Sequence, residues 1–183
     1  MPDHEQLPVR AARSGDSAAW NTLFQRFQLP LYSFVVELVR HEQAALDIVQ
    51  ESFTTAIRHV DSLRDDRRFG SWLFAIAHQR VVQHWRRESR TAHVFQETDA
   101  ALESVADDAE NPRDGLVRKE REAEFFALLE RLPEPQRAVL LLHFVEDFSL
   151  DEIATVTDAN LGTVKSRLHY AKKALRQLWE NRP

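Results

Sequence analysis

The spacing of apolar residues constrains the fold of this chain more than any other feature. Apolar residues recur at intervals of three and four along nearly the whole sequence, which is the period of a helix with one buried face. No stretch shows the sustained alternation of apolar and polar residues that half-buried strands require. Glycine, which disfavours helices, occurs only 4 times in 183 residues. The sequence therefore predicts an all-α protein.

Composition limits the kind of protein further. With 43% hydrophobic residues, the chain can bury one sizeable core or two small ones. Cysteine is absent, which excludes disulfides, thiolate zinc sites and cysteine nucleophiles and agrees with a reducing compartment. The longest apolar run, AVLLLHFV at residues 138–145, is too short to cross a bilayer, and the N-terminus lacks a signal-peptide core. We therefore expect a soluble, cytoplasmic protein.

The net charge of -5 is concentrated in one segment. Residues 1–90 carry 12 basic and 11 acidic side chains and residues 113–183 carry 12 of each, whereas residues 91–112 carry 6 acidic and no basic ones. This segment is also poor in large apolar residues and ends at a proline, as linkers often do. The predicted organisation is a helical domain over 1–90, an acidic linker over 91–112 and a smaller helical domain over 113–183.

Prolines and apolar periodicity predict where the individual helices of each domain begin and end. Pro30 is placed in the first turn of a helix because proline lacks an N–H group. The same reasoning places a helix start at the prolines of PEPQRAVLLLHFVE. The N-terminal domain is predicted to contain four helices, over residues 17–27, 30–40, 43–60 and 71–88, with room for a short helix before them. In the C-terminal domain a long helix over residues 114–132 precedes the one at the prolines, and two more helices follow it.

The C-terminal pair of helices is predicted to form a helix-turn-helix. Ser149 begins a short helix whose first turn is acidic. In the turn that follows, Asp158 can adopt a left-handed conformation and Asn160 can cap a second helix from about Leu161.

The second of these helices has a basic face. Residues 163–179 contain five Lys or Arg and no acidic residue. Such a helix can lie in a DNA major groove, with its apolar side on a supporting helix, although an ordinary solvated basic face is the alternative. On a helical wheel the apolar stripe is Val164, Leu168, Ala171, Leu175 and Leu178, the opposite face is Ser166, His169, Tyr170 and Lys173, and the flanks are Lys165, Lys172 and Arg176 on one side and Arg167 on the other.

A second acid-free stretch, residues 67–87, holds five basic residues interleaved with aromatic ones. Exposed aromatic rings beside cations are typical of surfaces that bind single-stranded nucleic acid. Trp72 is either core or surface, and Phe69, just before the helix, is expected to be freer of the core than Trp72. The wheel places Phe74, Ala77, Val81 and Trp85 in the core and Trp72, Gln79, Gln83, Arg86 and Arg87 on the opposite side.

Two further patterns have plain interpretations. His78 and His84 lie about 120° apart on the wheel, too far around the helix to share a ligand, so no metal site is predicted. The segment AALDIVQESFTTAIRHV turns Leu46, Val49, Phe53 and Ile57 toward a core and leaves a polar ridge, for which simple solvation is the default. That ridge consists of Asp47, Gln50, Glu51 and Thr54.

Together these motifs resemble the extracytoplasmic-function (ECF) group of bacterial RNA polymerase sigma factors over nearly the whole chain. LDIVQESF and FGSWLFAIAHQRVVQHWRR resemble region 2, and LERLPEPQRAVLLLHFVEDFSLDEIATVTDANLGTVKSRLHYAKKALR resembles region 4. The resemblance implies a non-enzymatic subunit without cofactors that directs core RNA polymerase to promoters. It implies three partners: core polymerase through its β′ clamp helices and β subunit, promoter DNA both double-stranded and locally melted, and an anti-sigma factor.

The resemblance also implies residue roles. Asp47, Gln50 and Glu51 would bind the β′ clamp helices. The minus-ten element would be bound by Arg67, Arg68, Phe69, Ser71, Trp72, Gln79, Arg80, Gln83, Arg86 and Arg87. The minus-thirty-five element would be bound by Thr163, Lys165, Ser166, Arg167, His169, Tyr170 and Lys173.

The chain departs from the family pattern at two places. Leu73 stands where primary sigma factors have a second tryptophan, which implies weaker strand opening. Thr157, Asp158 and Ala159 replace the usual leucine, glycine and isoleucine of the turn, so the recognition helix is expected to be tilted differently.

Two other function classes remain as alternatives. A stand-alone helix-turn-helix repressor would bind an inverted repeat as a symmetric dimer. An enzyme, such as a histidine-based metal hydrolase or a nuclease, would need convergent ligands or a nucleophile and base, and the sequence shows no such spacing.

Overall fold

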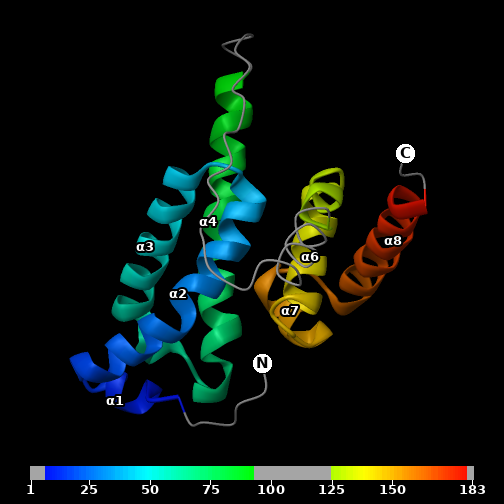
Figure 1. The fold of residues 1–183 in the computed structure, drawn as a ribbon. Helices are drawn as coiled ribbons and strands as arrows, with labels where there is room; N and C mark the ends of the chain where they lie inside the picture. Colours follow the sequence, from blue (N-terminus) through cyan, green and yellow to red (C-terminus); the bar gives the residue numbers. More distant parts are fainter. Residues whose placement is uncertain (1–6, 93–124, 181–183) are drawn as a thin grey trace, which may run out of the picture.

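The computed structural model describes residues 7–92 and 125–180, and every regular element in these two ranges is a helix (Figure 1). This confirms the all-α prediction. Residues 93–112 of the predicted acidic linker and residues 114–124 of the predicted long helix lie outside the described residues, whereas residues 91 and 92 belong to the end of helix α4. The N-terminal elements are α1 (Val9–Arg13), α2 (Ser17–Val39), α3 (Glu42–His59), the 3-10 turns η1 (Val60–Ser62) and η2 (Asp66–Arg68), and α4 (Phe69–Ala92). The C-terminal elements are a helical segment over residues 125–130, α6 (Glu134–Phe144), α7 (Leu150–Val156) and α8 (Leu161–Glu180).

Helix α2 runs through Pro30, so the prediction of two separate helices over 17–27 and 30–40 is wrong. A proline inside a helix costs about 3 kcal/mol. Phe27, Leu31 and Phe34 are all buried and share one face of the helix on either side of the proline. Each fully buried side chain of this kind contributes about 1.5–3 kcal/mol, so the continuous apolar face outweighs the proline. The short helix for which the sequence left room is α1.

Helix α3 buries a different face from the predicted one. Val49 and Phe53 are buried as expected, but Leu46 and Ile57 are 51% and 53% exposed. The centre of the buried face is instead formed by small residues, which allow neighbouring helices to approach closely. These residues are Ala45, Ser52 and Ala56.

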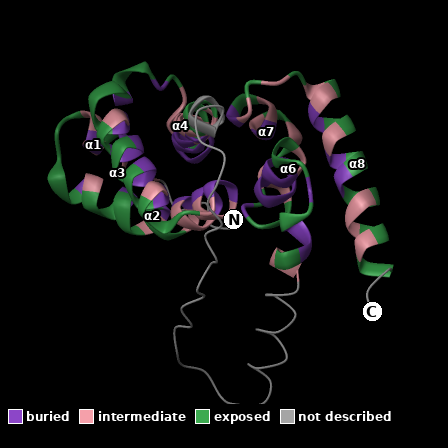
Figure 2. Ribbon diagram, turned by 90° about the horizontal axis from the view of Figure 1, so that it is seen from above, coloured by how far each residue is buried: buried purple, intermediate pink, exposed green. Residues whose placement is uncertain are grey.

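Helix α4 lies at the centre of the molecule (Figure 2). It begins at Phe69, two residues before the predicted start. Phe74, Ala77 and Val81 are fully buried, as predicted, and Trp85 packs against the core at its edge. Leu73 is also fully buried.

The helix-turn-helix forms with the predicted local signals. The Ser149 hydroxyl accepts from the Glu152 N–H while the Glu152 carboxylate accepts from the Ser149 N–H, which makes a capping box at the start of α7. Asp158 has a φ of 47°, in the left-handed region. The side chain of Asn160 accepts the Thr163 N–H at 2.8 Å and so caps α8.

The two helical units pack on each other, with α7 against α4 and α6 beside α2 (Figures 1 and 2). The ring of Phe148, just before α7, meets the ring of Phe74 edge-on at 5.1 Å. Arg137 of α6 donates to the Glu37 carbonyl of α2 at 3.0 Å. The same guanidinium donates to the carbonyls of Leu129, Glu130 and Leu132, so Arg137 bonds the ends of two helices at once.

Candidate nucleic-acid and polymerase interfaces

Helix α8 presents the predicted polar face to solvent. Val164, Leu168 and Ala171 are buried against α6 and α7. Ser166, His169, Tyr170 and Lys173 are exposed on the opposite face, and Lys165 is exposed beside them. Thr163 is half-buried, and its N–H and hydroxyl both donate to the side-chain oxygen of Asn160. The described part of α8 contains no acidic residue before Glu180.

Two cations of α8 differ in position from the rest. The Lys172 ammonium lies over the ring of Phe144, 5.1 Å from its centre, and therefore points toward α6. Arg167 is half-buried and close enough to His78 of α4 for its charge to disfavour protonation of that imidazole. Burial is the larger cause, and together they lower the pKa of His78 to about 4.

The segment before α4 carries exposed cations. Arg64, Arg67 and Arg68 are all exposed. Arg67 donates to both carboxylate oxygens of Asp65, at 3.0 Å each, and these hydrogen bonds lower the pKa of Asp65. Asp65 also accepts the Arg67 N–H at 3.1 Å and so caps η2. Arg67 is thus held in a fixed orientation at the surface.

Phe69 and Ser71, to which the resemblance gives roles in minus-ten binding, are both buried. Phe69 is fully buried, with ring contacts to Trp20, Phe27 and Trp72, so the expectation that it is freer of the core than Trp72 is wrong. Ser71 is 3% exposed and its hydroxyl donates to the Arg68 carbonyl. Trp72 is half-buried, with one part in the core and one at the surface. Neither Phe69 nor Ser71 can reach a nucleic acid in this conformation.

The outer face of α4 is polar and basic. Gln79, Gln83, Arg86 and Arg87 are exposed along it. Arg80 differs, because its guanidinium is paired with the Glu51 carboxylate and donates to the Thr55 hydroxyl at 2.5 Å. A residue expected to bind DNA is therefore bonded to a residue expected to bind polymerase.

The ridge on α3 is exposed at Asp47, Gln50 and Glu51. Leu46 and Ile57 lie beside it, so this surface combines carboxylates with apolar area. Such mixed surfaces are typical of protein–protein contacts rather than of simple solvation.

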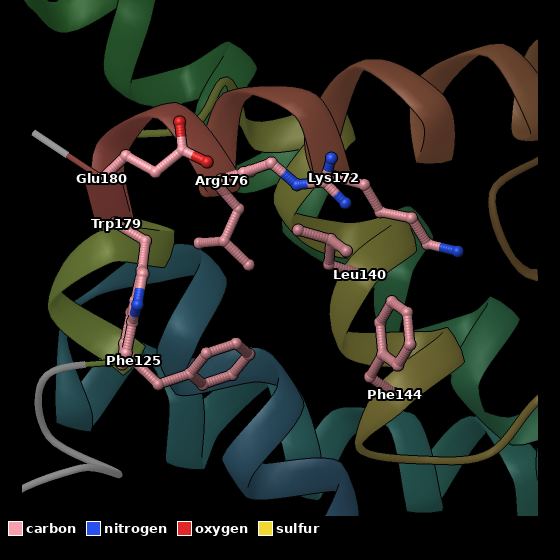
Figure 3. Close-up of a pocket in the computed structure, with 8 residues that line it drawn as sticks. Phe125, Leu140, Phe144, Lys172, Arg176, Trp179 and Glu180 are labelled. Carbon is pink, nitrogen blue, oxygen red and sulfur yellow. The ribbon is translucent and has the colours of Figure 1, made fainter.

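An apolar groove of about 410 Å³ lies between α6, the segment 125–130 and the end of α8 (Figure 3). Phe125 and Trp179 lie at one end, Phe144 and Lys172 at the other, and Leu140 between them. Sequence reasoning missed this groove, because Trp179 and Phe144 come from different helices and neither is unusual on its own.

Two family patterns match this chain. The pattern described as Sigma-70 region 2 matches residues 23–91, and that described as Sigma-70, region 4 matches residues 122–175. The RNA polymerase sigma-H factor of Pseudomonas aeruginosa is 32% identical over 182 residues, covering 94% of this chain and 92% of that protein. The ECF RNA polymerase sigma-E factor of Escherichia coli is 32% identical over 180 residues, covering 93% and 92%.

The chain belongs to the ECF sigma factors. Solved structures share the fold of this sigma factor. CnrH, in complex with the cytosolic domain of CnrY, has a TM-score of 0.68 at 21% identity and covers 99% of this chain and 100% of that one. The sigma factor RpoE of Bartonella quintana, in complex with the anti-sigma factor NepR, has a TM-score of 0.65 at 23% identity and covers 88% and 99%.

Membership in this group makes the protein an alternative sigma factor, which directs core RNA polymerase to promoters. These findings lend no support to the repressor alternative. Among the helices that the structure describes, none is both long and apolar enough to cross a membrane.

Proposed function

We propose that this sigma factor reads its promoters through two surfaces. The exposed face of α8 reads the minus-thirty-five element, and the outer face of α4 with the segment before it reads the minus-ten element. The observation that carries the proposal is the orientation of α8: an apolar stripe buried on its supporting helices and an opposite face of Ser166, His169, Tyr170 and Lys173. The domain boundaries at residues 90 and 113 are part of the same proposal.

Direct minus-ten contacts are assigned to a smaller set than the resemblance implies. Because Phe69 and Ser71 are buried, they support the surface from below. Arg80 stabilises the contact between α4 and α3 through Glu51. The proposed contacts are Arg67, Arg68, Trp72, Gln79, Gln83, Arg86 and Arg87.

The protein partners are assigned to the remaining surfaces. The ridge of Asp47, Gln50 and Glu51, widened by Leu46 and Ile57, binds the β′ clamp helices of core polymerase. CnrH and RpoE were solved with CnrY and NepR bound, and we assign an anti-sigma factor to this chain as well. The sigma factor acts in the cytoplasm and has no reaction of its own, because RNA synthesis belongs to the polymerase.

Promoter binding requires the two units to separate. The two elements are centred about 25 base pairs apart, which is about 85 Å at 3.4 Å per base pair. In the structure α7 packs directly on α4. The 32 residues between Ala92 and Phe125 can span about 105 Å when extended, so the chain is long enough for both contacts.

In vitro transcription with bacterial core polymerase on a promoter library tests the proposal. The wild-type chain should initiate from templates that share one pair of elements. Lys173→Gln should lower initiation and reduce the magnitude of the salt-dependence slope of promoter binding by about one, as loss of one phosphate contact predicts. Lys172→Gln is the matched control, since it removes the same charge from a side chain directed toward Phe144. If no template yields transcripts with the wild-type chain, the proposed function is wrong.

A further inference from the structure

The segment between α3 and α4 is bonded to a helix that is distant in sequence. Arg13, the last residue of α1, donates from Nη2 to the Leu63 carbonyl at 3.0 Å and to Oδ1 of Asp66 at 2.8 Å. Its Nε lies 3.8 Å from a carboxylate oxygen of Asp61. The guanidinium therefore bridges Leu63 and Asp66, the residues on either side of Arg64 and Asp65. This bridge closes the turn that presents the exposed cations.

Helix α1 is itself held firmly enough to act as a support. Val9 and Ala12 are buried. The Trp20 indole N–H donates to the Ala12 carbonyl at 2.9 Å, and the same indole meets the ring of Phe69 edge-on at 6.2 Å. The ring of Phe69 in turn lies 5.9 Å from that of Trp72. Helix α1 thus bonds the cationic segment directly through Arg13, and Trp20 of α2 connects it to the aromatic start of α4.

Arg13 also balances charge at this surface. Asp61 and Asp66 lie within a few residues of Arg64, Arg67 and Arg68, the cations that face solvent. Without Arg13 the two carboxylates would lack its compensating charge, would repel phosphate and would compete for the neighbouring arginines. A bond to a charged group in a half-buried position, as here, is among the stronger hydrogen bonds in proteins.

We propose that Arg13 is a positioning residue for minus-ten recognition, holding the segment from Asp61 to Arg68 in the orientation that reads DNA. This inference rests on the proposed function. Arg13 lies outside residues 23–91, the range of the region 2 match, so the family comparison assigns it no role. It touches neither DNA nor polymerase in the proposal and acts through Leu63 and Asp66.

The test compares sequence preference at the two promoter elements. Holoenzyme formed from core polymerase and the full-length chain transcribes two template pools, one randomised at the minus-ten element and the other at the minus-thirty-five element, and the transcripts are sequenced. Arg13→Gln should reduce the minus-ten preference about tenfold, the equivalent of one lost charged hydrogen bond. The minus-thirty-five preference and the affinity for core polymerase should stay unchanged, which a merely structural defect would not produce.

Three further variants sharpen the result. Asp66→Asn weakens the same bridge from the other side and should lower the minus-ten preference in the same way, and it decides the question if Arg13→Gln does not fold. Arg13→Lys keeps the charge but lacks the guanidinium fork, so it should restore only part of the preference. Arg10→Gln removes a charge from an exposed position on the same helix and should have no effect.

Two results would overturn the inference and are distinguishable. If wild-type holoenzyme transcribes but both Arg13→Gln and Asp66→Asn keep the full minus-ten preference, the positioning role is wrong while the proposed function stands. If wild-type chain with core polymerase yields no transcripts, the proposed function fails and this inference fails with it.

Discussion

The titration of His78 tests whether the two helical units pack together in solution. The imidazole lies between the units, with its ring centre 6.5 Å from that of Phe34 on α2 and within the field of Arg167 on α8. Burial first, and then the Arg167 charge, lower the pKa of His78 from 6.5 to about 4. The packed state therefore binds fewer protons at this site than a state in which the ring is solvated.

The sign and size of the effect follow from this difference. Above pH 6.5 the imidazole of His78 is neutral in both states, so the packed state has its full stability relative to the separated one. As the pH falls from 6.5 to about 4, the solvated ring of the separated state gains a proton first, and the packed state loses stability. Each pKa unit is worth about 1.36 kcal/mol, so the loss is about 1.4 kcal/mol at pH 5.5 and about 3 kcal/mol near pH 4. At pH 5.5 the ratio of packed to separated forms should fall about tenfold.

An NMR titration of the histidine ring protons measures the pKa directly, with the His78→Gln variant identifying the resonance. Arg167→Gln should raise the pKa of His78 but leave it below 6.5, because burial is the larger cause. Arg176→Gln removes the same charge from a more distant turn of α8 and should leave the titration unchanged. A wild-type pKa near 6.5 would refute the reasoning, since the ring would then be solvated and the units apart.

Three other substitutions have predicted effects on stability, each measured by urea unfolding. Burial raises the pKa of Glu146 to about 7, so its charged form is disfavoured and the stability of the wild-type protein should fall as the pH rises from 4.5 to 7. Glu146→Gln should remove this pH dependence and be more stable than wild type by about 2–3 kcal/mol at pH 8. A variant whose stability depends on pH as the wild type's does would contradict this. Asp158→Gly relieves a left-handed residue in the helix-turn-helix and should stabilise by about 1 kcal/mol, whereas a loss of stability would show that the Asp158 side chain contributes. Arg137→Met leaves four carbonyls without their donor and should lower the free energy of unfolding by about 3 kcal/mol or more. Arg137→Lys should not restore this stability, because one ammonium group cannot reach all four carbonyls. A loss of less than about 1 kcal/mol in Arg137→Met would contradict this.

Features that depend on neighbouring residues were predictable from the sequence. The helical class, the capping of α8 by Asn160, the left-handed Asp158 and the buried stripe of Val164, Leu168 and Ala171 all follow from contacts within a few positions of each other. Helical periodicity and capping are local physics, so one stretch of sequence determines them. The same holds for the opposite, exposed face of α8.

Tertiary structure decided the features that depend on residues far apart in the chain. Pro30 lies inside a helix because apolar residues on both sides of it bury against the same core. Phe69 is buried because Trp20 and Phe27 of α2 reach it, and Arg80 is held by Glu51, 29 residues earlier. Arg13 reaches Leu63 and Asp66 across 50 and 53 residues. Helical periodicity shows which residues share a face, but only the packed helices determine what that face touches, because such contacts depend on the positions of whole elements in space.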